Sequence, residues 1–175
     1  LMRTPIYTSK KLEKTIKKVI QKDEISETGI LGKWNATIFY VDRKKCWLIS
    51  NAKTQYCLIL PDIKSADLNS IDKKFKDSLY EQLNNDGIYI EFDKLNEIIG
   101  EIKFHPTDND RKTAGFQNHK LANLECWKID YEKYENMPFI DLASGLNSVP
   151  IHIGTSKKMD DFTKSTIEIK RLLTK

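Results

Sequence analysis

Residues 34–60 read WNATIFYVDRKKCWLISNAKTQYCLIL, and this stretch decides the fold. Three runs within it, residues 35–41, 46–50 and 54–60, are rich in the β-branched and aromatic residues that favour strands. Short, mostly polar segments separate the runs. Because connections this short can join only antiparallel neighbours, we predict a three-stranded antiparallel meander.

The register of the second hairpin depends on its turn. If that turn is centred on Asn51 and Ala52, Cys46 faces Cys57 across the two strands. A turn of three or five residues would change this register. Small buried thiols are the more common role for cysteines in such strands, so two core residues are the simpler interpretation.

The residues before the meander predict one strand and one helix. Residues 2–7 are typical of a short strand, and Pro5 would confine it to a sheet edge because proline has no backbone donor. Thr8 or Ser9 can then cap a helix over residues 9–20, whose apolar side chains recur at helical spacing.

The residues after the meander are mainly helical in pattern. An apolar stripe runs along residues 66–85 at helical spacing, with members Leu68, Ile71, Phe75, Leu79 and Leu83. Residues 101–105 predict a strand. Further helices are predicted over residues 110–131, with Ala114, Leu121 and Leu124 on the apolar side, over residues 138–146, and from Ser156 onward with Met159 and Phe162 in its stripe.

Together these elements predict an α+β fold. We expect an antiparallel meander at about residues 34–60, with an N-terminal edge strand and helix, packed against about four helices. A chain of 175 residues is of a size for one domain, so we expect a single domain over residues 1–175.

Composition indicates a polar globular protein with a basic front half. The net charge is +4, but residues 1–64 hold 13 Lys or Arg against 6 Asp or Glu. No apolar run approaches the ~18–20 residues of a membrane span, and no signal-peptide pattern opens the chain. We therefore expect a cytoplasmic protein without a membrane partner. The three cysteines include no CxxC pair, which favours free thiols.

The polar run at residues 107–111 is the best candidate for a site. Asp108, Asn109, Asp110 and Arg111 stand between a predicted strand and a predicted helix. The side-chain oxygens of Asp108, Asn109 and Asp110 suit a hard cation, yet capping or turn formation is the commoner use of such residues. We expect Asp108 or Thr107 to cap the helix. Two more candidates follow in that helix: Asn118, and Gly115, whose cost in a helix would be explained by close approach of a backbone or ligand.

The chain contains no strong catalytic or cofactor motif. It lacks a GxSxG elbow, an HExxH or EF-hand pattern and a phosphate-binding loop. We therefore predict no catalytic residue, no metal ligand and no cofactor.

Positive charge in the front half favours an anionic partner. Lys10 and Lys11 lie at the start of the first helix, and Arg43, Lys44 and Lys45 at the first hairpin turn, where they are expected to be exposed. Trp34 would offer a stacking surface for bases if it were exposed, although strand aromatics are more often core.

Three segments of the chain resemble an uncharacterised bacterial family, the domain of unknown function numbered 6933. They are Thr8-Ser9-Lys10-Lys11-Leu12, then residues 32–40 with residues 43–46, and finally residues 107–111 with Gly115 and Asn118. The resemblance spans roughly residues 3–130, and the segment from about residue 146 is less typical. It implies no activity and no site residue; it weakly favours a defence, counter-defence or regulatory setting.

Three functions remain open from the sequence. The leading hypothesis is a non-enzymatic protein that binds nucleic acid or a protein complex through its basic half. The first alternative is a protein-interaction module, such as an antitoxin-like or inhibitory factor. The second is an enzyme acting on a nucleotide or phosphorylated substrate, with Asp108, Asp110, Arg111 and Asn118 converging on a cleft.

Overall fold

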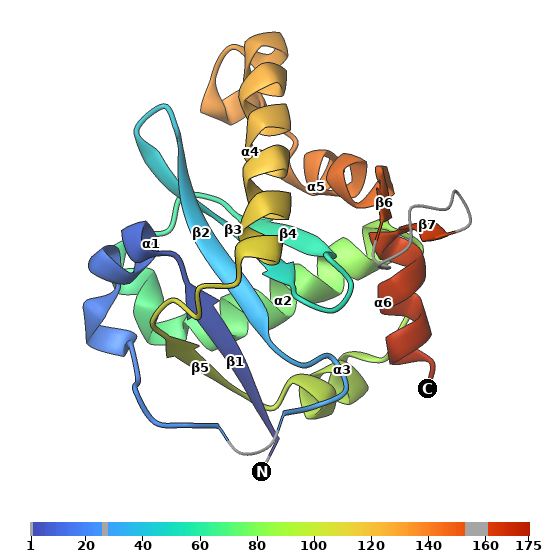
Figure 1. The fold of residues 1–175 in the computed structure, drawn as a ribbon. Helices are drawn as coiled ribbons and strands as arrows, with labels where there is room; N and C mark the ends of the chain where they lie inside the picture. The colour runs from blue at the N-terminus through green and yellow to red at the C-terminus, as the bar shows by residue number, and fades with distance from the viewer. Residues whose placement is uncertain (1, 26–27, 153–160) are drawn as a thin grey trace.

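The computed structural model describes residues 2–25, 28–152 and 161–175. Its centre is a five-stranded mixed sheet in the order β4-β3-β2-β1-β5 (Figure 1). The strands are β1 (Arg3–Thr8), β2 (Trp34–Val41), β3 (Lys44–Asn51), β4 (Cys57–Leu60) and β5 (Glu101–His105). The α+β prediction is confirmed, and β2, β3 and β4 form the predicted antiparallel meander.

The two meander turns differ. Asp42 and Arg43 both have positive φ angles, 49° and 68°, which suits a two-residue turn between paired Val41 and Lys44. The second loop is four residues long, because the N–H of Asn51 donates to the carbonyl of Tyr56.

The longer second loop shifts the register. Cys57 therefore pairs with Ser50, and the predicted alignment with Cys46 is wrong. The side chain of Asn51 stabilises the loop: its Oδ1 accepts from the N–H groups of Lys53 and Thr54, each at 3.1 Å.

The N-terminal strand lies inside the sheet, so the predicted edge position is wrong. β1 runs parallel to both β2 and β5. Proline is tolerated here because the β1–β2 register begins only at Ile6, one residue after Pro5. Along a strand, the N–H groups of every second residue point to the same neighbouring strand. The N–H of Ser9 donates to the carbonyl of Ala36 in β2, so the N–H that Pro5 lacks would also point toward β2.

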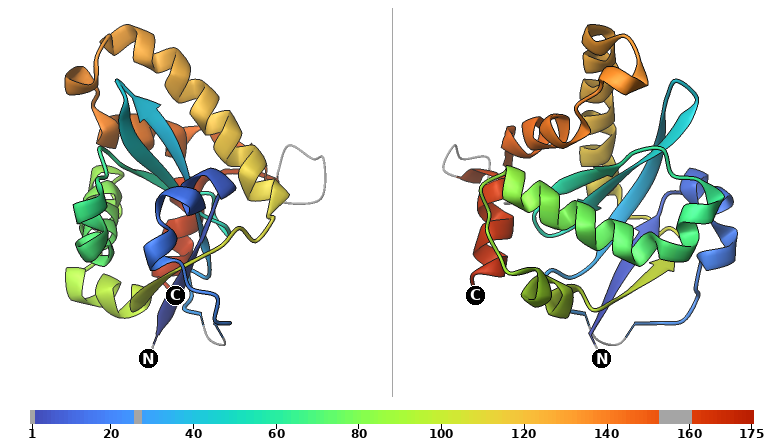
Figure 2. Two further views of the ribbon diagram at one scale, coloured as in Figure 1. Left: turned by 90° about the vertical axis from the view of Figure 1, so that its left-hand side faces the viewer. Right: turned by 180° about the vertical axis from the view of Figure 1, so that it is seen from behind.

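Helices cover the two faces of the sheet (Figure 2). One face carries α1 (Lys10–Thr15), α2 (Ile71–Asn85), α3 (Phe92–Ile99) and α6 (Ser165–Leu173). The other face carries α4 (Arg111–Tyr131) and α5 (Phe139–Ser148). Short 3₁₀ turns stand at Lys17–Val19, Ser65–Ser70 and Tyr134–Asn136, and a two-stranded ribbon is formed by β6 (Pro150–His152) and β7 (Phe162–Lys164).

The apolar stripe of α2 builds the larger core. All five predicted stripe residues are buried. Phe75 packs edge-on against Trp34, with ring centroids 5.3 Å apart. The two faces of β2 explain the two cores: Trp34 and Ile38 face the α2 side, whereas Phe39 and Val41 pack toward α4 and α5.

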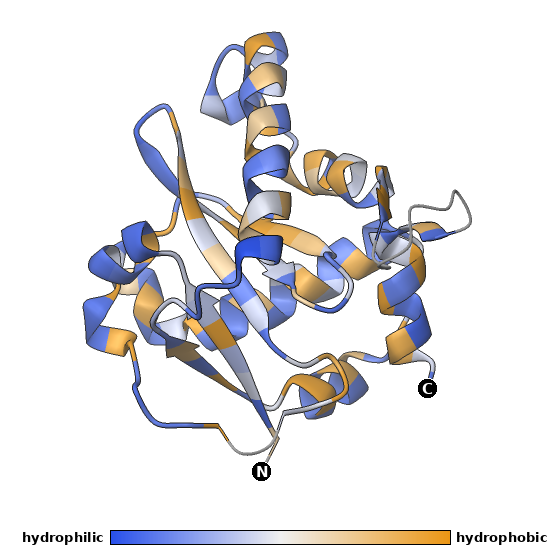
Figure 3. Ribbon diagram, in the orientation of Figure 1, coloured by the Kyte–Doolittle hydropathy of each residue, from blue (hydrophilic) through white to orange (hydrophobic). Residues whose placement is uncertain are grey.

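The first half of α4 carries mostly hydrophilic residues (Figure 3), and its buried side chains are polar. Its buried residues there are Thr113, Gln117 and Lys120, whereas the predicted stripe member Ala114 is exposed. Each is hydrogen bonded; for example, Gln117 Nε2 donates to the carbonyl of Asn35 at 2.8 Å. This buried polar face meets the sheet where the candidate residues gather.

The C-terminal part differs from the prediction. Phe162 lies in β7, and the last helix, α6, begins at Ser165. The predicted residues Ser156 and Met159 lie outside the described residues. Within the described parts, no helix combines the length and apolar character needed to cross a membrane.

Candidate functional site

A polar groove opens where the C-terminal ends of β1 and β5 meet the first turn of α4. Its volume is about 340 Å³, and its lining includes Tyr7, Lys10, Asn35, residues 107–111 and Gln117. We call this the polar groove. Ligands in sheets with parallel strands commonly bind outside the carboxyl ends of those strands.

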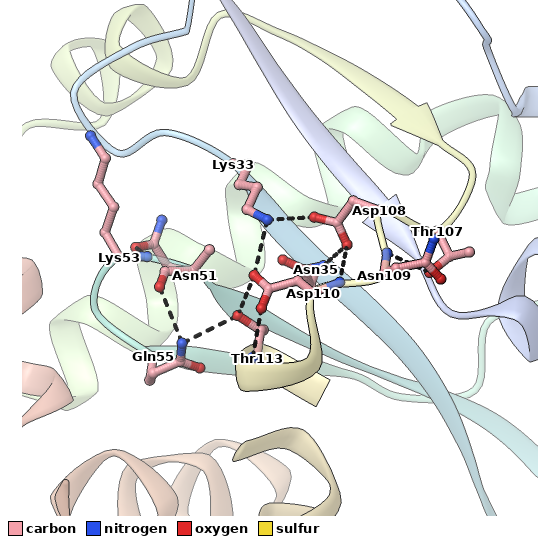
Figure 4. Close-up of polar contacts among 11 residues, drawn as sticks. Lys33, Asn35, Asn51, Lys53, Gln55, Thr107, Asp108, Asn109, Asp110 and Thr113 are labelled. Carbon is pink, nitrogen blue, oxygen red and sulfur yellow. Dashed lines mark hydrogen bonds and ion pairs between the residues drawn. The ribbon is translucent and has the colours of Figure 1, made fainter. Parts of the chain in front are cut away.

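Lys33 holds two carboxylates of this groove together (Figure 4). Its Nζ lies 2.5 Å from Asp108 Oδ2 and 2.9 Å from Asp110 Oδ2. Asn35 Nδ2 also donates to Asp108 Oδ1 at 3.0 Å. The start of β2 therefore fixes the segment that leads into α4.

Asp110, and not Asp108 or Thr107, caps α4. Its Oδ1 accepts from the N–H of Thr113 at 3.0 Å, and its Oδ2 accepts from the hydroxyl of Thr113 at 2.9 Å. Asp108 Oδ1 and Thr107 Oγ1 instead bond to backbone N–H groups two residues ahead, which shapes the tight turn before the helix.

The charges of this cluster stabilise one another. Partial burial opposes ionisation of Asp110, but the Thr113 N–H and the Lys33 ammonium outweigh it and lower the pKa of Asp110 to about 2. Burial likewise opposes the charge of Lys33, yet its bonds to the two aspartates raise the pKa of Lys33. The ion pairs stay formed at neutral pH.

The other candidates near α4 are placed differently. Arg111 and Lys10 both line the polar groove and are exposed, and neither forms an ion pair within residues 2–25, 28–152 and 161–175. Asn118 is exposed on α4 and does not line the groove. Among the described residues a Cβ built on Gly115 would meet nothing within 4 Å, so the expected close approach of another backbone is wrong, whereas approach of a ligand stays a prediction.

A second, basic groove lies at the tip of the β2–β3 hairpin. Its volume is about 500 Å³, and its charged lining is Asp42, Arg43, Lys44, Lys45, Asp62 and Lys64. We call this the basic groove. Apolar residues such as Ile16 and Leu68 line it as well. Arg43, Lys45 and Lys64 are exposed, so the hairpin-tip prediction holds for two of its three residues.

Lys44 is held more firmly than its neighbours. Its Nζ lies 3.7 Å from Asp62 Oδ2 and 5.0 Å from the ring centroid of Tyr134. Asp62 also lies 3.6 Å from Lys64 Nζ, so one carboxylate stands between two cations. Lys11 Nζ lies 5.2 Å from the ring centroid of Tyr40.

Trp34 cannot stack on a base in this structure. Its side chain is fully buried against Phe75, and Trp47 is buried as well. The condition under which Trp34 was a binding candidate is therefore not met, and its interpretation as a core residue is correct.

Sequence reasoning missed three polar residues. Asn35 lines the polar groove, and Lys33 pairs with two of its carboxylates; both lie inside the segment of residues 32–40 that carries the family resemblance. Lys120 is 5% exposed, and its Nζ donates to the carbonyl of Gln55. Burial lowers the pKa of Lys120. The sequence did contain a signal for Lys120: it lies at helical spacing from Thr113 and Gln117, on the same face of α4.

The fold and the grooves define an α+β protein with a mixed sheet and a polar groove at its parallel strand ends. The chain belongs to the family described as a domain of unknown function, DUF6933, which matches residues 5–166. The match extends well past residue 130, where the resemblance in the sequence ended. No curated protein and no solved structure matches the chain. All three family-like segments contribute residues to the polar groove, namely Lys10, Asn35 and residues 107–111.

Proposed function

We propose that this protein is a non-enzymatic nucleic-acid-binding protein that holds phosphates in its basic groove. The observation that carries this is the convergence of Arg43, Lys45 and Lys64, all exposed, on one groove of about 500 Å³. Arg43 and Lys45 come from the hairpin tip, whereas Lys64 comes from the segment after β4. Convergence of cations from separate segments on a concave surface favours a polyanion over solvent alone.

Neighbouring residues extend the positive surface. Lys11 stands beside Tyr40, and Tyr40 pairs with Lys45 across the hairpin. Lys18 donates from the turn after α1 to the carbonyl of Ser65, next to Lys64. The Lys-rich start of the chain thus lies beside the basic groove.

The polar groove favours binding over acid–base chemistry. Asp108 and Asp110 both accept from Lys33, and Asp110 also caps α4. A general acid or base at neutral pH needs a pKa near that pH, whereas the pKa of Asp110 is about 2. These carboxylates act as structural anchors of the groove wall.

Binding and its salt dependence test the proposal. We expect the protein to bind labelled single-stranded and duplex oligonucleotides at low salt, with affinity falling steeply as salt rises. The triple variant Arg43→Ala, Lys45→Ala, Lys64→Ala should lose at least about tenfold in affinity and lower the logarithmic salt slope by about 2–3, roughly one unit per phosphate contact.

A matched control separates the groove from net charge. The variant Lys94→Ala, Lys170→Ala, Lys175→Ala removes the same charge from exposed positions outside the basic groove. It should bind like the unchanged protein in fluorescence anisotropy titrations. Equal losses in both triple variants would show an unspecific charge effect, and no binding at low salt would refute the proposal.

A further inference from the structure

We infer that the polar groove takes one unpaired nucleotide of the bound strand, which makes the preferred partner single-stranded. This inference rests on the proposed function and adds a second site to it. The groove lies at the C-terminal end of β1, and the basic groove lies at the tip of the hairpin formed by β2 and β3.

Two free cations suit the phosphate of that nucleotide. Lys10 and Arg111 stand at the first residues of α1 and α4 and line the groove together. In the described part of the chain neither meets a carboxylate. Lys33, by contrast, is occupied by Asp108 and Asp110. Phosphate would therefore meet the rim cations without displacing an internal ion pair.

A buried acceptor without a donor suits the base. Asn35 is 8% exposed and lines the groove, and its Oδ1 has no hydrogen-bond partner among the described residues. Its Nδ2 is held by Asp108, so the amide cannot rotate to satisfy the oxygen without losing that bond. Unpaired buried acceptors are uncommon and costly, and a small shift of the groove wall on binding would expose this one to the N–H groups of a base.

The groove also offers an aromatic surface. Tyr7 lines it and is only partly buried. Its ring lies 5.3 Å from that of His105 and 5.7 Å from Lys33 Nζ. An aromatic ring beside an amide and two cations matches the parts of a nucleotide: a flat base, its polar edge and its phosphate.

Size and position favour an unpaired nucleotide. A volume of about 340 Å³ lies at the lower end of the range for small-molecule pockets. A base inside a duplex could enter only by leaving the stack, whereas a single strand offers its bases freely. The start of α1 links the two grooves, because the hydroxyl of Thr37 in β2 bonds to that of Ser9 at 3.1 Å and Lys11 reaches Tyr40.

Mononucleotides test the pocket without the strand. We expect the 5′-monophosphates of adenosine, guanosine, cytidine and uridine to bind in calorimetric titrations, at least one of them at millimolar concentration or tighter. Adenosine and inorganic phosphate alone should bind more weakly. Arg111→Gln and Asn35→Ala should each weaken the best nucleotide about fivefold to tenfold. Lys14→Gln, an exposed change on α1 that lines neither groove, should leave it unchanged.

The oligonucleotide experiment separates the two claims. Asn35→Ala and Arg111→Gln should reduce the preference for single strands over duplexes, whereas the basic-groove triple variant should weaken both. Arg111 is on the surface, so its variant remains informative if Asn35→Ala fails to fold. Oligonucleotide binding that is untouched by both pocket variants, together with no mononucleotide binding, would overturn the pocket and leave the proposed function standing. Absence of oligonucleotide binding in the unchanged protein overturns the proposed function itself.

Discussion

The polar groove pairs its two aspartates with one lysine at short distance, whereas the basic groove holds its one shared carboxylate, Asp62, at longer distance from two lysines. In the polar groove, Lys33 lies within 2.9 Å of two aspartates whose side chains are 16% and 20% exposed. In the basic groove, Asp62 approaches Lys44 and Lys64 only to 3.7 Å and 3.6 Å. The first arrangement organises the backbone before α4. The second leaves Arg43 and Lys45 without an ion pair among the described residues, which is what the proposed recognition of an anionic partner requires.

The largest expected effect comes from removing one lysine in each groove. Lys33→Met leaves two partly buried carboxylates close together without their cation, and we expect it to lower the free energy of unfolding by about 2–3 kcal/mol. Lys45→Met removes an exposed charge and should change stability by less than about 0.5 kcal/mol. Urea unfolding at neutral pH measures both.

Equal losses of stability in Lys33→Met and Lys45→Met would contradict this difference between the two grooves. In that case the Lys33 ion pairs would gain no more than their desolvation costs, and the polar groove would be held by hydrogen bonds alone. Lys33→Arg is the useful companion. It keeps the charge, so it should retain more stability than Lys33→Met.

The fold was largely predictable because its signals are local. The strands at residues 34–60 follow from their β-branched and aromatic residues, and the stripe of α2 follows from residue spacing. The central position of β1 could not be predicted in this way. Proline is excluded from a central strand only where its missing N–H would be needed for a bond, and the β1–β2 register, which begins after Pro5, depends on the tertiary fold. The second turn failed for a similar reason: the side chain of Asn51 organises a longer loop.

The candidate site was predictable in place but not in partners. The run at residues 107–111 was recognised from its composition and its position before a helix. Lys33 lies 75 residues from Asp108 in the sequence, and no local pattern joins them. The cap was misassigned by two residues because Asp108 and Asp110 are equally good capping types, and only the turn decides between them.

Lys33 and Lys120 stand in surroundings that shift their pKa values in opposite directions. Both are partly or fully removed from water, but ion pairs raise the pKa of Lys33, whereas burial lowers that of Lys120 below the usual 10.5. At pH values between the lowered pKa of Lys120 and 10.5, this lysine is protonated in the unfolded chain but not in the folded protein. The free energy of unfolding therefore rises with pH over this range. Lys120→Met removes this contribution.

We expect the free energy of unfolding to rise more steeply with pH in the unchanged protein than in Lys120→Met. The difference between the two proteins should grow as the pH rises toward 10.5. Both proteins keep Cys46 and Cys57, whose pKa values burial raises, so these two thiols affect both curves alike. Parallel curves for the two proteins would show that Lys120 keeps its proton on folding.

The smallest expected effect tests whether the basic groove is partly self-neutralised. Asp62 lies between Lys44 and Lys64, where a phosphate would compete with it. Asp62→Asn should change stability by less than about 0.5 kcal/mol, because these pairs are long and partly exposed. It should strengthen oligonucleotide binding about twofold to threefold and steepen the salt dependence, since two cations lose their internal partner. Asp77→Asn on α2, which frees only Lys73, is the control and should not change binding. Weaker binding by Asp62→Asn would mean that Asp62 positions the two lysines for the ligand, and the basic groove would then resemble the polar groove in depending on fixed charges.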